Sequence, residues 1–280
     1  MALISNPNNF FCENHFVFIE NKILLKCSDN PSALTKEDLP DENLLRKLMK
    51  EQLVCDWFTE KEYNYSAWLL EKDAPVPSGT RAINFRQFFW DAKDLMSGNK
   101  NAFEKMVSLA CRAHGLLLLR QTYRFCPACG KPLLDDEHFT AKKCSKCGSL
   151  LFPRIEPAII VLVKKEDKIL LAKNKNSVTG HYSCIAGFVE QGENLEQAVH
   201  REVYEETGLK IKNLRYAGSQ AWPFPDQLML AYYADWESGQ IKIQEEELES
   251  AEWFSYENLP SPLSPPGSAA YNLIYNQFDK

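Results

Sequence analysis

The chain has 280 residues, of which 45% are hydrophobic and 25% charged, and this composition excludes a largely disordered or fibrous protein. Its net charge of −6 provides no broad basic surface for duplex nucleic acid. No apolar run approaches the roughly 18 residues that a membrane helix needs. Because no export signal is visible and the nine cysteines are an odd number, we expect a cytoplasmic protein without a disulfide framework.

The first 122 residues predict an α+β domain that carries no recognisable chemical motif. Residues 16–20 and 22–26 have the pattern of a β-hairpin, and residues 42–58 have apolar side chains at near-helical spacing. Two prolines and a glycine predict a loop over residues 73–80. Residues 102–121 predict one long helix or two.

Two C-x2-C pairs follow, Cys126 with Cys129 and Cys144 with Cys147. Each pair is followed by a glycine that permits a tight turn, and two such turns predict a tetrahedral four-sulfur site for Zn²⁺. A redox pair or incidental buried cysteines are the alternatives, but a redox site needs only one such pair. Four thiolates leave no open coordination position, so we expect a structural metal.

The predicted zinc ribbon is locally basic, and its lysines leave nucleic-acid binding open as a minor alternative to a solvated surface. The remaining cysteines show no ligand spacing, and we expect them to be small buried hydrophobes. They are Cys12, Cys27, Cys55, Cys111 and Cys184.

From Pro157 onward, short β-branched runs alternate with helical patterns, which predicts a mixed sheet with helices packed on it. A helix is expected over residues 194–207, stopped by Gly208, and a short one over residues 269–278 after a proline-rich loop. The expected strands are residues 158–163, 169–172, 182–186, 211–219, 228–235 and 252–255.

The helix over residues 194–207 carries an unusual set of acids. Ala198, Glu202 and Glu206 follow one line at a spacing of four residues. This line runs beside an apolar line that must face the core, so both carboxylates lie at the edge of buried surface. Glu205 adds a third acid, and such like charges destabilise a helix unless a cation is present.

Clustered carboxylates are hard oxygen ligands, which favour Mg²⁺ or Mn²⁺ and leave positions for water and phosphate oxygens. Arg201 can pair with Glu193 or Glu205 and hold a carboxylate in position. Gly187 would let the backbone approach the metal, with the Ala186 carbonyl as a further ligand. The pattern predicts a site for phosphate chemistry.

The full pattern from Gly187 to Leu209 is G-x5-E-x7-R-E-U-x-E-E-x-G-U, where U is aliphatic, and the chain meets it at every defined position. An acidic helix face that is merely solvated does not require these residues at these positions. The chain resembles the Nudix hydrolase superfamily, whose members cleave a nucleoside diphosphate linked to another group. The resemblance implies an α/β/α sandwich in residues 153–280. This sandwich follows the α+β domain predicted in residues 1–122 and the zinc ribbon predicted in residues 123–152.

Residues 219–227, Ser-Gln-Ala-Trp-Pro-Phe-Pro-Asp-Gln, resemble the S-Q-P-W-P-F-P-x-S motif of the NADH pyrophosphatase (NudC-like) branch, which also carries a four-cysteine ribbon. Ala221 and Gln227 depart from the motif's proline and serine. Prolines on both sides of Phe224 predict an extended, rigid loop that presents aromatic rings for stacking. Burial of these rings in the core is the alternative.

The resemblance implies substrate contacts for Phe152, Glu247 and Ala270, the last in a loop, while Phe188 is a stacking candidate from its place beside Gly187. It also implies that Glu247 joins Glu202, Glu206 and the Ala186 carbonyl as a ligand of Mg²⁺ or Mn²⁺. The motif residues that would contact substrate are Gln220, Ala221, Trp222, Pro223, Phe224, Pro225, Asp226 and Gln227.

The resulting hypothesis is a homodimeric, metal-dependent pyrophosphatase that hydrolyses NAD(H) to a nicotinamide mononucleotide and AMP. Glu202, Glu205 and Glu206 are the candidate catalytic residues, and Glu205 or a glutamate of the run at 245–247 would be the general base. Removal of NAD caps from RNA is an extension of the same chemistry. Hydrolysis of ADP-ribose or another dinucleotide is one alternative, and a non-catalytic nucleotide-binding regulator is another.

Overall fold

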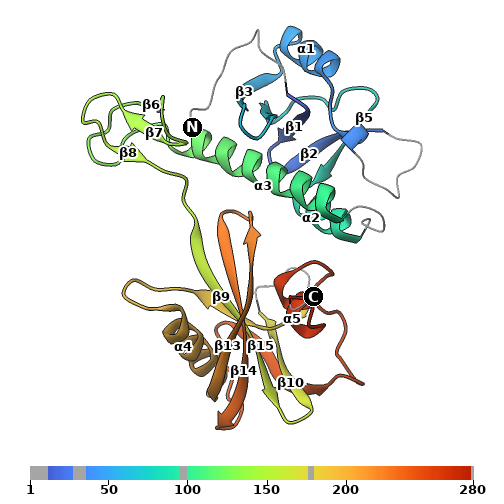
Figure 1. Ribbon diagram of the computed structural model, residues 1–280, viewed down its shortest axis with the longest axis vertical. Helices are drawn as coiled ribbons and strands as arrows, with labels where there is room; N and C mark the ends of the chain where they lie inside the picture. Colours follow the sequence, from blue (N-terminus) through green and yellow to red (C-terminus); the bar gives the residue numbers. More distant parts are fainter. Residues whose placement is uncertain (1–11, 28–35, 95–99, 176–179, 279–280) are drawn as a thin grey trace. The chain divides into compact units, whose positions relative to one another are not determined.

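The computed structural model describes residues 12–27, 36–94, 100–175 and 180–278. The chain divides into two compact units, Met1–Arg154 and Ile155–Lys280 (Figure 1). Within the described ranges, no helix is both long enough and apolar enough to pass through a bilayer.

A five-stranded sheet in the order β3-β4-β1-β2-β5 forms the centre of the first unit. The predicted hairpin is confirmed, because β1 and β2 pair antiparallel, whereas β1 and β4 are parallel. The predicted long helix is also confirmed, as the single helix α3 (Lys100–Thr122). The other elements are β1 (Asn14–Ile19), β2 (Lys22–Lys26), η1 (Lys36–Asp38), α1 (Glu42–Lys50), β3 (Val54–Glu60), β4 (Tyr65–Leu70), β5 (Thr80–Asn84) and α2 (Phe85–Asp94).

The helix predicted over residues 42–58 is wrong in its second half. Helix α1 ends at Lys50, and Gln52 has a φ of 56°, in the left-handed region that breaks a helix. The chain then forms β3, whose Trp57 stacks on Trp68 of β4 with ring centroids 4.7 Å apart. Pairing with β4 therefore overrides the apolar spacing of this segment.

Both faces of this sheet are covered by helices. Leu45 and Leu48 of α1 pack against Val17 and Trp68 on one face. On the other face the ring of Phe18 contacts Phe85, at 5.3 Å between centroids, and His114 of α3, at 5.2 Å. Alternate residues of β1 therefore belong to two different layers, as expected for a strand between two layers of helices.

A separate three-stranded sheet follows α3 and carries the cysteine pairs. Its strands are β6 (Leu133–Asp135), β7 (Lys142–Cys144) and β8 (Leu150–Leu151), in that order. Arg120 of α3 donates to both carboxylate oxygens of Asp56 and pairs with Asp135 of β6, to which Lys142 Nζ also donates at 2.9 Å. These ion pairs connect the ribbon to the rest of the first unit.

The second unit is built on a seven-stranded mixed sheet. Its main path is β11-β10-β9-β14-β13, with β12 paired to β9 and β15 paired to β10. Strand β14 runs parallel to β9 and forms a long antiparallel hairpin with β13. The elements are β9 (Glu156–Lys165), β10 (Lys168–Asn174), β11 (Tyr182–Ser183), β12 (Ile185–Phe188), α4 (Leu195–Thr207), β13 (Lys210–Trp222), β14 (Gln227–Ser238), β15 (Leu248–Ser255) and α5 (Ala269–Ile274).

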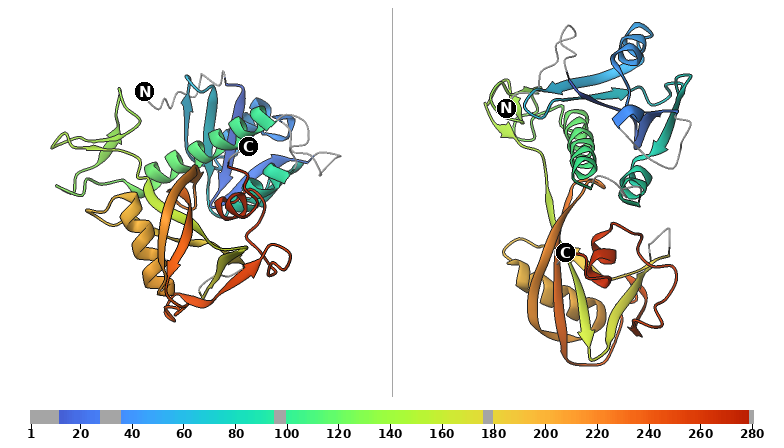
Figure 2. Two further views of the ribbon diagram at one scale, coloured as in Figure 1. Left: turned by 60° about the horizontal axis from the view of Figure 1, so that its bottom comes forward. Right: turned by 45° about the vertical axis from the view of Figure 1, so that its right-hand side comes forward.

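Helices α4 and α5 lie on opposite faces of this sheet, as both views in Figure 2 show. Ile159 and Val161 of β9 pack with Val199 and Val203 of α4. The intervening residues of β9, Ile160 among them, pack with α5. This alternation confirms the predicted α/β/α sandwich.

Three elements of the second unit differ in detail from the prediction. The strand expected at residues 182–186 is interrupted at Cys184 and forms β11 and β12, which pair with different strands. The terminal helix ends at Ile274 rather than at residue 278. Residues 223–226 form a tight turn between β13 and β14, so the extended loop expected there is wrong.

Candidate functional site

Helix α4 is defined at both ends by its own sequence. Asn194 caps the N-terminus by accepting from the backbone N of Gln197 at 2.8 Å, and the Gln197 side chain accepts from the Asn194 backbone N at 2.9 Å. Gly208 ends the helix with a φ of 69°, a conformation that favours glycine. These caps place the acidic line of α4 in a fixed rotation against the sheet.

The carboxylates of Glu202 and Glu206 lie deeper than the sequence indicated, with 9% and 5% of each residue exposed. Burial, together with the charges of Glu202, Glu247 and Glu205, raises the pKa of Glu206 to about 8. Burial also raises the pKa of Glu202, an effect that hydrogen bonds from Arg201 oppose. Among the described residues, no cation pairs with Glu206.

Gly187, at the end of β12, leaves room for the Glu202 carboxylate. A Cβ at this position would overlap all three atoms of that carboxylate group. The sequence predicted that Gly187 admits a metal to the backbone. That stays a prediction, and the structure shows a further role for the absent side chain: it admits the Glu202 carboxylate, which the helix could not otherwise bring so close to the strand.

Arg201 organises the acids around it, as predicted. Its Nε and Nη2 donate to the two oxygens of Glu193 at 2.6 and 2.9 Å, and its Nη1 donates to Glu202 and Glu205 at 2.8 and 3.1 Å. Nη2 also donates to the Phe188 carbonyl at 2.9 Å. These bonds hold the pKa of Glu193 at about 2. The planar guanidinium therefore fixes one side of the acidic cluster and leaves Glu206 unpaired.

The loop before β15 brings further acids to this cluster. Gln244 N donates to the Glu206 carbonyl at 3.0 Å, and Lys242 N donates to the Thr207 carbonyl at 2.8 Å. The exposed residues Glu245, Glu246 and Glu247 follow. Of these three, Glu247 is the one whose charge raises the pKa values of both Glu202 and Glu206.

The motif with two prolines occupies the tip of the β13–β14 hairpin. The rings of Trp222 and Phe224 meet edge to face at 5.2 Å, and both side chains are half-buried. Pro223 is buried, whereas Ala221 and Pro225 are exposed. Asp226, at the end of the turn, accepts from the Glu156 backbone N through its carbonyl at 2.8 Å, and Gln227 begins β14.

The other predicted substrate contacts lie in different parts of the molecule. Gln220 Nε2 donates to the Gly267 carbonyl at 2.8 Å, and Gln220 Oε1 is buried without a hydrogen-bond partner in the described part of the chain. Phe188 is 50% exposed in the second unit, and Phe152 is 55% exposed in the first. Ala270 lies in α5 rather than in a loop, and it is buried.

Residues 154–275 match the family model described as NUDIX domain. This part of the chain is therefore similar to the domain that defines the Nudix family.

Part of the chain also resembles named relatives. Over 174 residues, 62% of this chain, the sequence is 46% identical to the "NAD-capped RNA hydrolase NudC" of Chromobacterium violaceum. It is 46% identical over 169 residues to the protein of the same name in Klebsiella pneumoniae. Each match covers 65% of the relative's length. A solved structure, a NUDIX hydrolase from Nitrosomonas europaea, is 21% identical with a TM-score of 0.48, covering 55% of this chain and 90% of that one.

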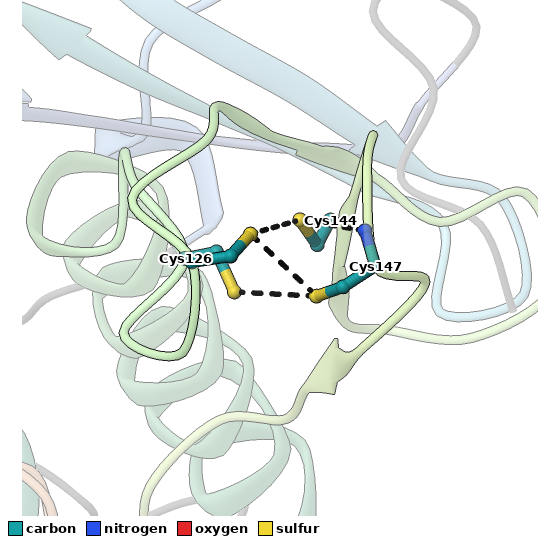
Figure 3. A group of neighbouring side chains, drawn as sticks. Cys126, Cys144 and Cys147 are labelled. Atoms are coloured by element: carbon teal, nitrogen blue, oxygen red, sulfur yellow. Dashed lines mark hydrogen bonds between the residues drawn. The ribbon is translucent and has the colours of Figure 1, made fainter.

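The four ribbon cysteines converge as predicted. Their Sγ atoms all lie within 4.8 Å of one another, and Figure 3 shows Cys126, Cys144 and Cys147 pointing toward a common centre. Three of the Sγ–Sγ separations are 3.4, 3.7 and 3.7 Å. Two sulfurs that bind one tetrahedral Zn²⁺ lie about 3.8 Å apart. The cluster therefore has the dimensions of a metal site.

Main-chain and hydroxyl donors stabilise thiolates in this cluster. The backbone N atoms of Lys146 and Cys147 each lie 3.4 Å from Cys144 Sγ and donate to it, which lowers the pKa of that thiol. Bonds from Ser149 lower the pKa of Cys147 to about 6. Thiolate is the form that binds metal, so these donors favour cation binding at Cys144 and Cys147. The pKa of Cys129 is instead raised to about 12, because a bond from the Lys131 backbone is outweighed by contacts with the other cysteines and by burial.

The other five cysteines are only partly as expected. Cys111 and Cys184 are buried, which confirms the prediction for them. Cys27 and Cys55 are exposed and Cys12 is half-buried, so the expectation of burial was wrong there. Apolar neighbours in sequence do not determine burial for a residue at a strand end or in a sheet's edge strand, as Cys55 in β3 shows.

Proposed function

We propose that this chain is a divalent-metal-dependent pyrophosphatase that hydrolyses NAD(H) to a nicotinamide mononucleotide and AMP, and that it removes NAD caps from RNA. The names of the NudC relatives support the substrate, and the matched segment spans 65% of their length. The observation that carries the proposal is Glu206, a carboxylate 5% exposed beside Glu202 and without a cationic partner among the described residues.

The donors present suit Mg²⁺ or Mn²⁺. Carboxylate and carbonyl oxygens are the ligands these ions prefer, and a cation at this place would offset the burial and repulsion that raise the pKa of Glu206. Glu202, Glu206, Glu247 and the Ala186 carbonyl are the ligands we assign. The bound ions would neutralise the diphosphate and lower the pKa of an attacking water.

The remaining residues would position and activate the reactants. Arg201 holds Glu202 and Glu205 through one nitrogen, so that the two carboxylates keep a fixed spacing. We assign the role of general base to Glu205, whose side chain is 52% exposed and open to water, with a glutamate of the run at 245–247 as the alternative. Such positioning and charge neutralisation supply most of the rate enhancement in phosphoryl transfer.

Within the NUDIX domain, the aromatic hairpin tip and Phe188 would receive the dinucleotide. Trp222, Phe224 and Phe188 provide ring faces for a base or a nicotinamide. The unpartnered Gln220 Oε1 would accept a hydrogen bond from the ligand. Ala221, Pro223, Pro225, Asp226 and Gln227 complete this segment, and Ala270 would contribute only through its backbone because its side chain is buried.

The proposal also includes a structural Zn²⁺ in the four-cysteine cluster, a homodimeric assembly and a cytoplasmic location. The cluster's dimensions support the zinc. All nine cysteines are free thiols, as is typical of a reducing compartment. The ribbon, residues 123–152, would then be a third domain between residues 1–122 and residues 153–280.

A competition assay tests the proposal. The purified full chain, with Mg²⁺ or Mn²⁺, is given NADH, NAD, ADP-ribose and NAD-capped RNA, and AMP or 5′-monophosphate RNA is measured. We expect NADH or NAD to have the highest kcat/KM among the small substrates, and we expect loss of product with Glu206→Gln or without metal. A preference for ADP-ribose would replace the assigned substrate, and nucleotide binding without turnover would instead indicate a regulator.

A further inference from the structure

The acidic cluster includes one glutamate, Glu247, that lies outside α4, in the loop before β15. Glu247 follows two other exposed glutamates, and its charge raises the pKa values of Glu202 and Glu206. Because these like charges repel one another, the loop would move toward solvent unless other contacts held it. The contacts that hold it come from two directions.

One set of contacts comes from α4. The backbone N atoms of Lys242 and Gln244 donate to the carbonyls of Thr207 and Glu206, at 2.8 and 3.0 Å. The loop then turns, with Glu247 N donating to the Gln244 carbonyl at 3.0 Å. These bonds fix where the loop starts, but they do not reach the far side of Glu247.

The second set comes from the end of β10. The pairing of β10 with β15 shifts its register at Lys173/Asn174, where Lys173 lies opposite Ser250 but Asn174 lies opposite Leu248. This β-bulge brings the next residue, Lys175, opposite the glutamate loop. Its backbone N donates to the Glu247 carbonyl at 2.8 Å, and its Nζ donates to the Glu245 carbonyl at 3.0 Å.

We infer that Lys175 is a positioning residue that holds Glu247 against Glu202 and Glu206 and so sets the affinity of the acidic cluster for its divalent ion. This inference rests on the proposed function for the identity of the cluster as a metal site. Two donors from one residue hold the main chain on both sides of Glu246, and the ammonium also lies on a loop with a high density of negative charge. Groups that orient a metal ligand control affinity without touching the metal.

The test measures Mn²⁺ binding to the full chain without substrate, by calorimetry or by the electron paramagnetic resonance of free Mn²⁺. Lys175→Met is expected to weaken binding by on the order of tenfold, the lower limit for losing a group that orients a ligand. Lys175→Arg keeps a donor and is expected to restore binding to within about twofold. Under limiting Mn²⁺, the same variants should change turnover of NADH in the same order.

Lys173→Met is the matched control. Lys173 lies on the same strand, and its Nζ pairs with the Glu249 carboxylate at 2.9 Å, but it makes no bond to residues 245–247. Its loss should leave Mn²⁺ affinity unchanged. Equal weakening by both substitutions would overturn the inference, because it would indicate a general effect on the pairing of β10 with β15. The melting temperature of each variant is measured alongside.

A double variant identifies the residue through which Lys175 acts. In a Glu247→Gln background, Lys175→Met should change Mn²⁺ affinity by less than about twofold, because the carboxylate that it positions is already gone. A full tenfold loss in that background would overturn the inference. If the unmodified chain binds Mn²⁺ with the expected order among variants but releases no AMP from NADH, the proposed function fails while the positioning role stands.

Discussion

The two units treat buried charge in opposite ways. In the first unit, Glu60 is 1% exposed, and its carboxylate accepts two bonds from Arg112, at 2.6 and 2.8 Å, and one from the Tyr65 hydroxyl at 2.6 Å. In the second unit, Glu206 is 5% exposed and faces other carboxylates, with no cation beside it among the described residues.

This difference separates a structural charge from a functional one. A buried carboxylate with every oxygen bonded is compensated within the fold, and it needs nothing further. A buried carboxylate beside like charges raises the free energy of the folded state, and a fold retains it where a bound cation repays that cost. The comparison therefore predicts that substitutions in the first unit affect stability, whereas those in the acidic cluster affect activity.

The largest effect is expected at the four-cysteine cluster of the first unit, for which we propose a structural zinc ion. Cys144→Ser should abolish stoichiometric zinc binding and unfold strands β6 to β8, because structural zinc sites contribute about 10 kcal/mol or more of folding free energy. Metal analysis and hydrogen exchange of the ribbon amides would measure this. Cys55→Ser, at an exposed thiol outside the cluster, is the control. Zinc retained at full stoichiometry in Cys144→Ser would contradict the assignment.

The next effect concerns the compensated charge. Arg112→Met leaves Glu60 buried with only Tyr65 as a partner, so the first unit should lose about 3–5 kcal/mol of unfolding free energy. Urea unfolding measures the loss. Arg46→Met removes an exposed ion pair with Glu42 and should cost less than about 1 kcal/mol. If the two substitutions lower the free energy of unfolding equally, Arg112 does not compensate the buried charge of Glu60, contrary to what the geometry indicates.

Removal of the uncompensated carboxylate of Glu206 should lower activity without lowering stability. Glu206→Gln is expected to lower kcat/KM for NADH by about 10² to 10³, the usual loss when one electrostatic group of an active site is removed. Its metal-free stability should stay equal or rise, because the amide relieves the repulsion from Glu202 and Glu247. Glu196→Gln, at an exposed position in the first turn of α4, is the control. If the Glu206→Gln protein is destabilised but still active, the contrast between the buried carboxylates of Glu60 and Glu206 is wrong.

The sequence predicted the parts of this fold whose signals are local. Helix α4, with Asn194 and Gly208 at its ends, and strand β9, with its two apolar faces, carry their determinants within a few residues. The end of α1 was not predictable in this way. The apolar spacing continues past Lys50, and only the pairing of β3 with β4 and the stacking of Trp57 on Trp68 end the helix there.

The same distinction applies to the candidate site. Local sequence was enough to place Glu202 and Glu206 on one line of α4 and to predict a pair between Arg201 and Glu193, which lies just before the helix. The close approach of Gly187 to Glu202 and the contact of Lys175 with Glu245 were not visible, because each joins different elements. The latter pair is 70 residues apart in the chain, and no sequence pattern marks Lys175.

The smallest expected effect comes from a buried group that the first unit keeps neutral. His114 lies against Phe85, at 4.8 Å between ring centroids, and its Nδ1 is buried without a hydrogen-bond partner in the described part of the chain. Burial lowers the pKa of His114 to about 4, from 6.5. Protonation is therefore easier in the unfolded chain than in the folded one, and the folded state is favoured most above pH 6.5.

As the pH falls from 6.5 to about 4, the first unit should lose on the order of 3 kcal/mol of stability through His114. Urea midpoints followed by the fluorescence of the stacked pair Trp57 and Trp68 measure this loss. His114→Leu should remove that part of the pH dependence, because an apolar side chain suits the same aromatic contacts and has no proton to gain. His200→Leu, at an exposed histidine of α4, should leave it in place. If the stability of both variants falls in parallel as the pH falls, the neutral state of His114 contributes nothing to the pH dependence. The first unit would then avoid uncompensated charge through its ion pairs alone.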